Sequence, residues 1–166
     1  MQGGLNMNKT NLRGCAYSPG YSDMGGEMHS EALKKDEDGN WQIVSRDRAS
    51  LNEPTVITTY AVSQEAFERF ESFLEEKDVL SLANRKESSF FLYDYSPWNY
   101  RFVFEKNDNG RLVWDRYQIS QYKEYSDSDN QLLEELKRQF RDLHGEKISL
   151  EEEISNALNN TGFLNR

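Results

Sequence analysis

Residues 27–62 alternate apolar and polar side chains in short runs, a pattern typical of β-strands. The clearest run, 54–62, is rich in β-branched residues and opens with a proline, which a first strand position tolerates. The runs 27–35 and 40–48 flank the turn-forming residues 36–39, and together they predict a hairpin. Residues 17–26 are dense in glycine and serine, so we expect an irregular loop or a short edge strand there.

The next segment has a helical period. Ser63 is a typical N-cap and Glu65 places a negative charge in the first turn, so a helix is expected over 64–77. The apolar positions on its buried face are Ala66, Phe67, Phe70, Phe73 and Leu74.

A second half repeats the order of strands followed by a helix. Residues 90–95, 99–105 and 111–120 read as strands, and Asn109-Gly110 between the last two predicts a type I′ hairpin turn. Ser128 with Gln131 forms a capping-box pattern ahead of a helix. The apolar face of that helix is formed by Leu132, Leu133, Leu136, Phe140 and Leu143.

These elements predict one α+β domain: a mainly antiparallel sheet of about six strands with two principal helices on one face. When the sequence is compared with itself at an offset of 57 residues, Trp41 aligns with Trp98 and Tyr60 with Tyr117. Either the domain consists of two similar βββα halves, or these matches arise by chance. We expect residues 1–14 to be a flexible arm and 15–148 to be the domain. Residues 149–166 are expected to form a short acidic helix and a frayed tail.

Charge and composition limit the classes of partner. The chain has 166 residues, a net charge of −9 and 13% aromatic residues. Such a charge disfavours binding to nucleic acid or to an anionic membrane surface. The negative charge suits a cationic protein partner, or else it only keeps the protein soluble. The sequence does not indicate an oligomeric state.

Cysteine usage and hydropathy bear on the compartment. Cys15 is the only cysteine, so no intrachain disulfide can form. No apolar stretch approaches the length of a spanning helix, and residues 1–14 lack the apolar centre of a signal peptide. We expect a cytoplasmic protein, although export of a longer natural form is compatible with these features.

No catalytic residue, metal site or cofactor is predicted. Cys15, His29 and His144 share no zinc-like spacing. Residues 36–41 begin like a calcium-binding loop, but Trp41 occupies the position of the required glycine. Residues 105–116 contain the glycine, but Arg116 occupies the position of the required glutamate. A Cys15–His29 nucleophilic pair has no support from spacing alone. The 29 acidic residues are too many for carboxylate pairs to be informative.

Two aromatic Ser-Pro segments, 17–21 and 93–100, are the most distinctive candidates for binding. Tyrosine and tryptophan combine apolar area with a polar group, which suits contact with a protein partner or a sugar. We predict partner binding by Tyr17, Tyr21, Tyr95 and Trp98. The alternative is that about half of these rings face the core and the Ser-Pro segments are merely rigid turns.

Residues 20–26, 59–63 and 94–98 resemble segments of uncharacterised small proteins from Gram-positive gut bacteria. The resemblance covers about residues 14–148. It implies a bacterial protein, and it implies no activity, cofactor or site residue.

Three functions remain open on the sequence. The first is a non-enzymatic binding module that uses an aromatic patch on an acidic surface. The second is an acidic inhibitor or immunity-type protein directed against a cationic enzyme. The third is an enzyme whose carboxylates and tyrosines meet only in the folded chain.

Overall fold

The computed structural model describes residues 11–22, 26–89 and 95–153. These residues contain seven strands and three helices. In chain order they are β1 (Asn11–Ser22), β2 (Met28–Lys35), β3 (Trp41–Arg48), β4 (Thr55–Ala61), α1 (Gln64–Glu76), the 3₁₀ helix η3 (Val79–Asn84), β5 (Tyr95–Asp108), β6 (Arg111–Ser120), α2 (Asp127–Arg141) and β7 (Lys147–Glu153). An α+β fold with a mainly antiparallel sheet is confirmed.

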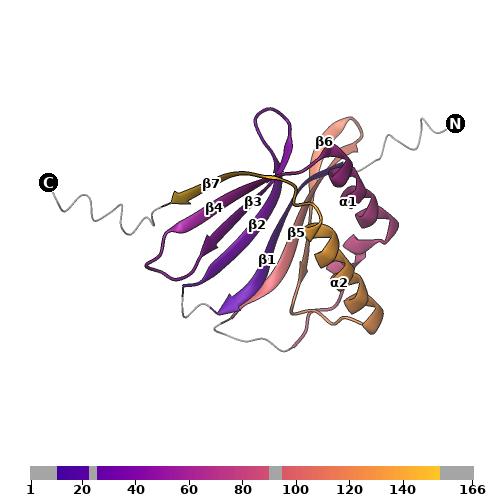
Figure 1. Cartoon of the computed structure of the whole chain (residues 1–166). Helices are drawn as coiled ribbons and strands as arrows, with labels where there is room; N and C mark the ends of the chain where they lie inside the picture. The colour runs from indigo at the N-terminus through magenta and orange to yellow at the C-terminus, as the bar shows by residue number, and fades with distance from the viewer. Residues whose placement is uncertain (1–10, 23–25, 90–94, 154–166) are drawn as a thin grey trace.

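The seven strands form a single sheet in the order β6-β5-β1-β2-β3-β4-β7 (Figure 1). Every neighbouring pair in it is antiparallel. β1 to β4 are successive neighbours, whereas β5 returns to pair with β1 and β7 returns to pair with β4. The later strands are thus added to both sides of the first four.

Alternate strand residues face opposite sides of the sheet, so it has two chemically distinct faces. We call the face that contacts the helices the inner face. At its centre Cys15 lies opposite both Leu33 and Phe102, and Leu33 lies opposite Ile43. All four side chains are buried. The intervening residues form the outer face.

α1 begins and packs as its sequence pattern predicts. The Ser63 side chain accepts a hydrogen bond from the Ala66 amide at 3.0 Å. Phe67 stacks on Trp41 of β3 with the ring centroids 3.9 Å apart, which places α1 on the inner face. The buried residues of the helix are Phe67, Phe70, Phe73 and Leu74.

α2 begins earlier than predicted, because the capping box is formed by Ser126 and Asp129. The Ser126 side chain accepts from the Asp129 amide and the Asp129 carboxylate accepts from the Ser126 amide, both at 3.1 Å. The predicted box of Ser128 and Gln131 is therefore wrong. Asp129 is held in place by a tertiary contact, since its two oxygens also accept hydrogen bonds from Arg85 at 2.8 and 3.0 Å.

The segment that starts at Lys147 is a strand, so the short acidic helix predicted from residue 149 is wrong. β7 pairs with β4 from Thr55↔Glu153 to Tyr60↔Lys147. Without this pairing β4 would present a row of unsatisfied backbone groups, whereas an isolated short helix gains little stability in water. Residues 154–166 lie outside the described residues.

The domain also starts before residue 15. β1 begins at Asn11, and Leu12 is 2% exposed, so the predicted arm of 1–14 is wrong for residues 11–14. Burial of Leu12 against the core draws these residues into the sheet. Residues 1–10 lie outside the described part of the chain.

The described elements do not divide into two βββα halves. Four strands precede α1, two lie between α1 and α2, and β7 follows α2. The described sheet therefore has seven strands, whereas about six were predicted. Trp41 and Trp98, which the offset aligns, lie in strands with different neighbours. β3 lies between β2 and β4, and β5 lies between β6 and β1.

The hairpin turn between β5 and β6 is confirmed. Asn109 and Gly110 have φ angles of 52° and 86°, as a type I′ turn requires at both central positions. The Asn107 side chain accepts a hydrogen bond from the Gly110 amide at 2.8 Å. This turn sets the register in which Asp108 lies opposite Arg111.

Ser126→Ala is expected to lower the free energy of unfolding by about 0.5–2 kcal/mol, because α2 loses an acceptor for its first-turn amides. Ser128→Ala makes the same chemical change two residues later, and it should stay within about 0.5 kcal/mol of the wild type. Urea unfolding followed by circular dichroism measures both variants. Equal losses in the two variants would contradict the assignment of the cap.

Candidate functional site

A cleft of about 430 Å³ lies between α2 and the inner face of β1 and β5. Its sheet wall is formed by aromatic rings and a proline, and its helix wall by polar and aliphatic side chains. The residues that line it are Tyr17, Pro19, Trp98, Tyr100, Asn130, Leu133, Glu134 and Lys137. We call it the aromatic cleft.

The register of β1 and β5 brings these rings together. Tyr17 lies opposite Tyr100 and Pro19 lies opposite Trp98, so all four share one face. The rings of Tyr17 and Tyr100 stack with their centroids 4.6 Å apart. Trp98 stacks on Tyr125 and meets Tyr100 edge-on, with centroid separations of 6.2 Å in both cases. Each ring is therefore oriented by another ring before any ligand arrives.

The two tyrosines of the cleft remain neutral at physiological pH. Burial raises the pKa of Tyr17 and of Tyr100 above the ordinary value. Tyr100 is buried, whereas Tyr17 and Trp98 are half-buried and keep part of their rings accessible. The cleft thus offers aromatic surface together with uncharged hydroxyl groups.

The helix wall is held at its N-terminal end by an ion pair. Asn130, Glu134 and Lys137 lie on one side of α2, because residues three and four apart are neighbours on a helix. Just before them, Arg85 makes its two-point contact with Asp129 and holds the pKa of that carboxyl at about 2. Arg85 is the C-cap of η3, so the pair joins α2 to η3.

Two of the four predicted binding residues meet in this cleft. Tyr17 and Trp98 line it directly. Tyr21 and Tyr95 lie in the paired ends of the same strands, β1 and β5. Their side chains lie outside the described part of the structure, so their role stays a prediction.

The two Ser-Pro segments lie in strands where turns had been considered. Residues 17–22 continue β1, and residues 95–108 are continuous in β5, so the predicted turn at Pro97 is wrong. After Tyr17, β1 pairs only with β5 in the described part of the chain. Before Asn99, β5 likewise pairs only with β1 there. Pro19 and Pro97 therefore occupy positions with one neighbouring strand, where a missing N–H is tolerated.

Beside the aromatic cleft, both histidines of the chain share one carboxylate. Glu31 Oε2 lies 2.9 Å from His144 Nε2, and Glu31 Oε1 lies 3.2 Å from His29 Nε2. His29 Nδ1 also contacts Asp47, which accepts a hydrogen bond from Ser45 Oγ at 2.9 Å. We call these five residues the histidine cluster.

The histidine cluster adjoins the aromatic cleft at Tyr17, which lies opposite Glu31 across β1 and β2. The ring of Phe140 in α2 contacts both Tyr17 and His144, at centroid distances of 5.7 and 6.2 Å. His144 follows the C-terminal end of α2. The pair of Glu31 and His144 therefore ties this end of the helix to the sheet.

The ionisation of the cluster follows from its hydrogen bonds. Burial by itself would raise the pKa of Glu31, but the hydrogen bonds from His144 and His29 outweigh it and hold this pKa at about 2. The hydrogen bond to Glu31 raises the pKa of His29 to about 9, with Asp47 adding to the rise and burial opposing it. The same carboxylate raises the pKa of His144. His29 is therefore positively charged at neutral pH, and the contact with Glu31 favours the charged form of His144.

Part of this cluster is visible in the sequence as alternation. His29 and Glu31 share a strand face, as do Ser45 and Asp47, because each pair is two residues apart. No sequence pattern brings His144 to Glu31, since that contact forms only when the end of α2 packs on the sheet. The cluster was therefore missed by sequence reasoning.

The Cys15–His29 pair does not form. Cys15 lies opposite Leu33, which is four residues from His29 along β2, a separation of roughly 13 Å at the rise of a strand. Burial also raises the pKa of the Cys15 thiol, which makes it a poor nucleophile.

Within the described residues, no group of three or more His, Cys, Asp or Glu side chains is arranged to hold a metal ion. The charged groups of the histidine cluster satisfy one another, and neither histidine lines the aromatic cleft. The cluster thus acts as an electrostatic clamp on α2, and the cleft is the candidate binding site.

No protein-family model, curated protein or solved structure matches the chain. The resemblance to small proteins of Gram-positive gut bacteria stays a prediction. In the described part of the chain, no helix is both long enough and apolar enough to cross a membrane.

Glu31→Gln is expected to destabilise the fold in a pH-dependent manner. Because the folded-state pKa of each histidine is raised, their contribution is complete below the unfolded value of about 6.5. It is lost as the pH rises through each folded-state value, which for His29 is about 9. The lowered pKa of Glu31 removes its contribution only as the pH falls towards about 2. The loss on substitution should therefore be largest near pH 5.5, about 1–2 kcal/mol.

Urea unfolding at about pH 5.5, 7.5 and 9.5 measures this loss for Glu31→Gln against the wild type. Glu37→Gln changes an exposed turn residue and serves as the matched control, with no pH-dependent difference expected. A loss for Glu31→Gln that stays constant from pH 5.5 to 9.5 would show that the histidine contacts do not stabilise the fold.

Proposed function

We propose that the protein is a non-enzymatic binding module whose aromatic cleft accepts a cationic segment of a partner protein. The observation that carries the proposal is the meeting of Tyr17, Trp98 and Tyr100 with the carboxylate of Glu134 in one cleft. Aromatic faces attract Lys and Arg side chains, and a neighbouring carboxylate adds a hydrogen-bonding partner for the same cation.

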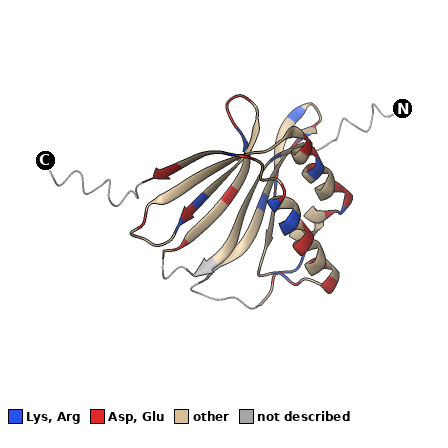
Figure 2. Cartoon of the chain, in the orientation of Figure 1, with Lys and Arg blue, Asp and Glu red and all other residues tan. Residues whose placement is uncertain are grey.

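The charge of the helical layer supports a cationic partner. α1 carries five glutamates and a single arginine, and acidic positions recur along it in Figure 2. The whole chain has a net charge of −9. Such a field accelerates encounter with a basic surface and makes the association sensitive to salt.

The position of Lys137 limits what the cleft accepts. It lies about one turn beyond Glu134 on the same side of α2 and lines the same cleft. An ammonium group at this point repels any cationic side chain that lies close to it. The cleft therefore favours one Lys or Arg at the Glu134 end, which gives the module selectivity by repulsion.

An acidic inhibitor or immunity-type protein is a narrower form of the same proposal, in which the basic segment belongs to an enzyme. The acidic surface of α1 supports this form. An enzyme with a tyrosine site is less well supported. The pKa values of Tyr17 and Tyr100 are raised, whereas a catalytic phenolate would need them lowered.

Peptides selected from a random display library on the wild-type protein are expected to be rich in Lys and Arg. Glu134→Lys should weaken the selected peptides at least about tenfold, because attraction at the cleft becomes repulsion. Isothermal titration calorimetry measures the affinities. Raising the ionic strength from about 50 to 500 mM should weaken wild-type binding further.

Glu135→Lys is the matched control. It makes the same charge change one residue along α2, but Glu135 lines a different hollow, which is shared with α1. Its effect should stay within about threefold. Selected peptides without basic residues, or equal losses in the two variants, would overturn the proposal.

A further inference from the structure

The outer face of the sheet has a charge opposite to that of the whole protein. Side-chain alternation and strand register place more cationic than acidic residues on it within the described strands. The cationic residues are Arg13, Lys34, Arg46, Arg48, Arg101 and Arg116, and the acidic ones are Glu105, Glu151 and Glu153. Cations are thus gathered on this face in a chain whose net charge is −9.

Two of these arginines are left without a partner among the described residues. Arg13 and Arg46 form ion pairs with glutamates of the same face, and Arg48 donates to a backbone carbonyl. Arg101 and Arg116 are exposed and form no ion pair or hydrogen bond within the described part of the chain. Their positive charge is therefore available to an external anion.

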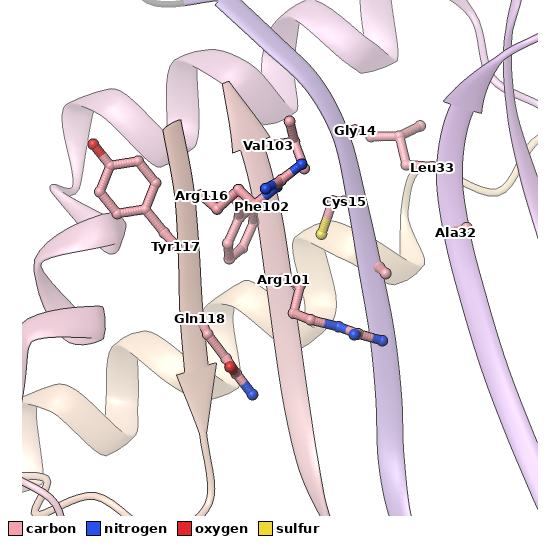
Figure 3. Close-up of a pocket in the computed structure, with 11 residues that line it drawn as sticks. Gly14, Cys15, Ala32, Leu33, Arg101, Phe102, Val103, Arg116, Tyr117 and Gln118 are labelled. Atoms are coloured by element: carbon pink, nitrogen blue, oxygen red, sulfur yellow. The ribbon is translucent and has the colours of Figure 1, made fainter. Parts of the chain in front are cut away.

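Arg101 and Arg116 flank a hollow of about 550 Å³ (Figure 3). Its floor is formed by the small residues Gly14, Ala16 and Ala32 on the adjacent strands β1 and β2. Ala16 lies opposite Arg101 on one side and Ala32 on the other. Figure 3 shows the Arg101 side chain extending from β5 towards β1. Small apolar side chains thus leave space directly beside an unpaired cation.

The two arginines are neighbours on adjacent strands and line the same hollow. Arg101 lies opposite Gln118 and Arg116 lies opposite Val103, so the arginines are diagonal neighbours with Cβ atoms about 7 Å apart. Guanidinium groups bind carboxylate and phosphate oxygens through two parallel hydrogen bonds. A mostly apolar hollow with a few polar groups is the usual form of a small-molecule site.

We propose that this hollow binds a small amphiphilic anion. Arg101 and Arg116 hold its carboxylate or phosphate group, and its apolar body lies on the floor formed by Ala16 and Ala32. A long nucleic acid suits the site less, because the rest of the protein would repel it. A peptide strand would need a free sheet edge, whereas the hollow lies within the sheet. The site is on the opposite face from the aromatic cleft and independent of it.

Titration of the isotopically labelled full chain tests this assignment by two-dimensional NMR. The probes are octanoate and octyl phosphate, with 1-octanol as the uncharged control and acetate as the control without an apolar body. We expect at least one of the two amphiphilic anions to shift the amides of Ala16, Ala32 and Val103. It should bind at least about tenfold more tightly than either control. The tighter of the two anions identifies the group as carboxylate or phosphate.

Arg101→Gln and Arg116→Gln should each weaken the preferred anion about tenfold or more, because hydrogen bonds between charged groups are lost. Both residues are exposed, so the fold should be retained. Arg46→Gln is the matched control on the same face, since Arg46 is already paired, and it should change the affinity less than about twofold. Ala16→Leu fills the hollow and should abolish binding with both arginines intact.

Several results would overturn the proposal. Binding of 1-octanol as tight as that of octanoate and octyl phosphate would remove the role of the arginines. So would an equal affinity loss in Arg46→Gln and Arg101→Gln. Amide shifts confined to the aromatic cleft, or no amide shifts with either anion, would show that the hollow is not an anion-binding site.

Discussion

The pairing of β1 with β5 is the contact on which both binding surfaces depend. It joins two strands far apart in the sequence, and the burial of Cys15 and Phe102 on its inner face stabilises it. On that face the register stacks Tyr17 on Tyr100 and so builds the wall of the aromatic cleft. On the outer face the same register sets Arg101 beside Ala16. A shift of one residue would exchange the two faces and destroy both surfaces.

The helix that completes the cleft is held at both ends by charged groups. At its start, Arg85 binds Asp129 through two hydrogen bonds, and near its end His144 binds Glu31 of β2. Between these points the rings of the inner face contact Phe140. The wall of the cleft is therefore set before a partner binds, which reduces the ordering that binding requires.

Charge is divided between the two layers of the molecule. The helical layer is acidic, with five glutamates on α1. The outer face of the sheet carries Arg101 and Arg116, which have no partner among the residues that the structure describes. The proposed cationic partner and the proposed small anion would therefore approach from opposite sides. A net charge of −9 describes the chain as a whole but not either surface taken alone.

The sequence by itself determined the features that depend on residues a few positions apart. The Ser63 cap, the helix that follows it and the turn at Gly110 were predicted correctly, and clustering along the chain drew attention to Tyr17 and Trp98. Only the tertiary structure decided that Ser126 caps α2, that the segment after Lys147 is a strand, and that His144 meets Glu31. The physical reason is that a local pattern reports hydrogen bonds within a turn or a helix. A sheet edge that needs a partner, or a carboxylate that needs a cation, exists only after distant segments have packed together.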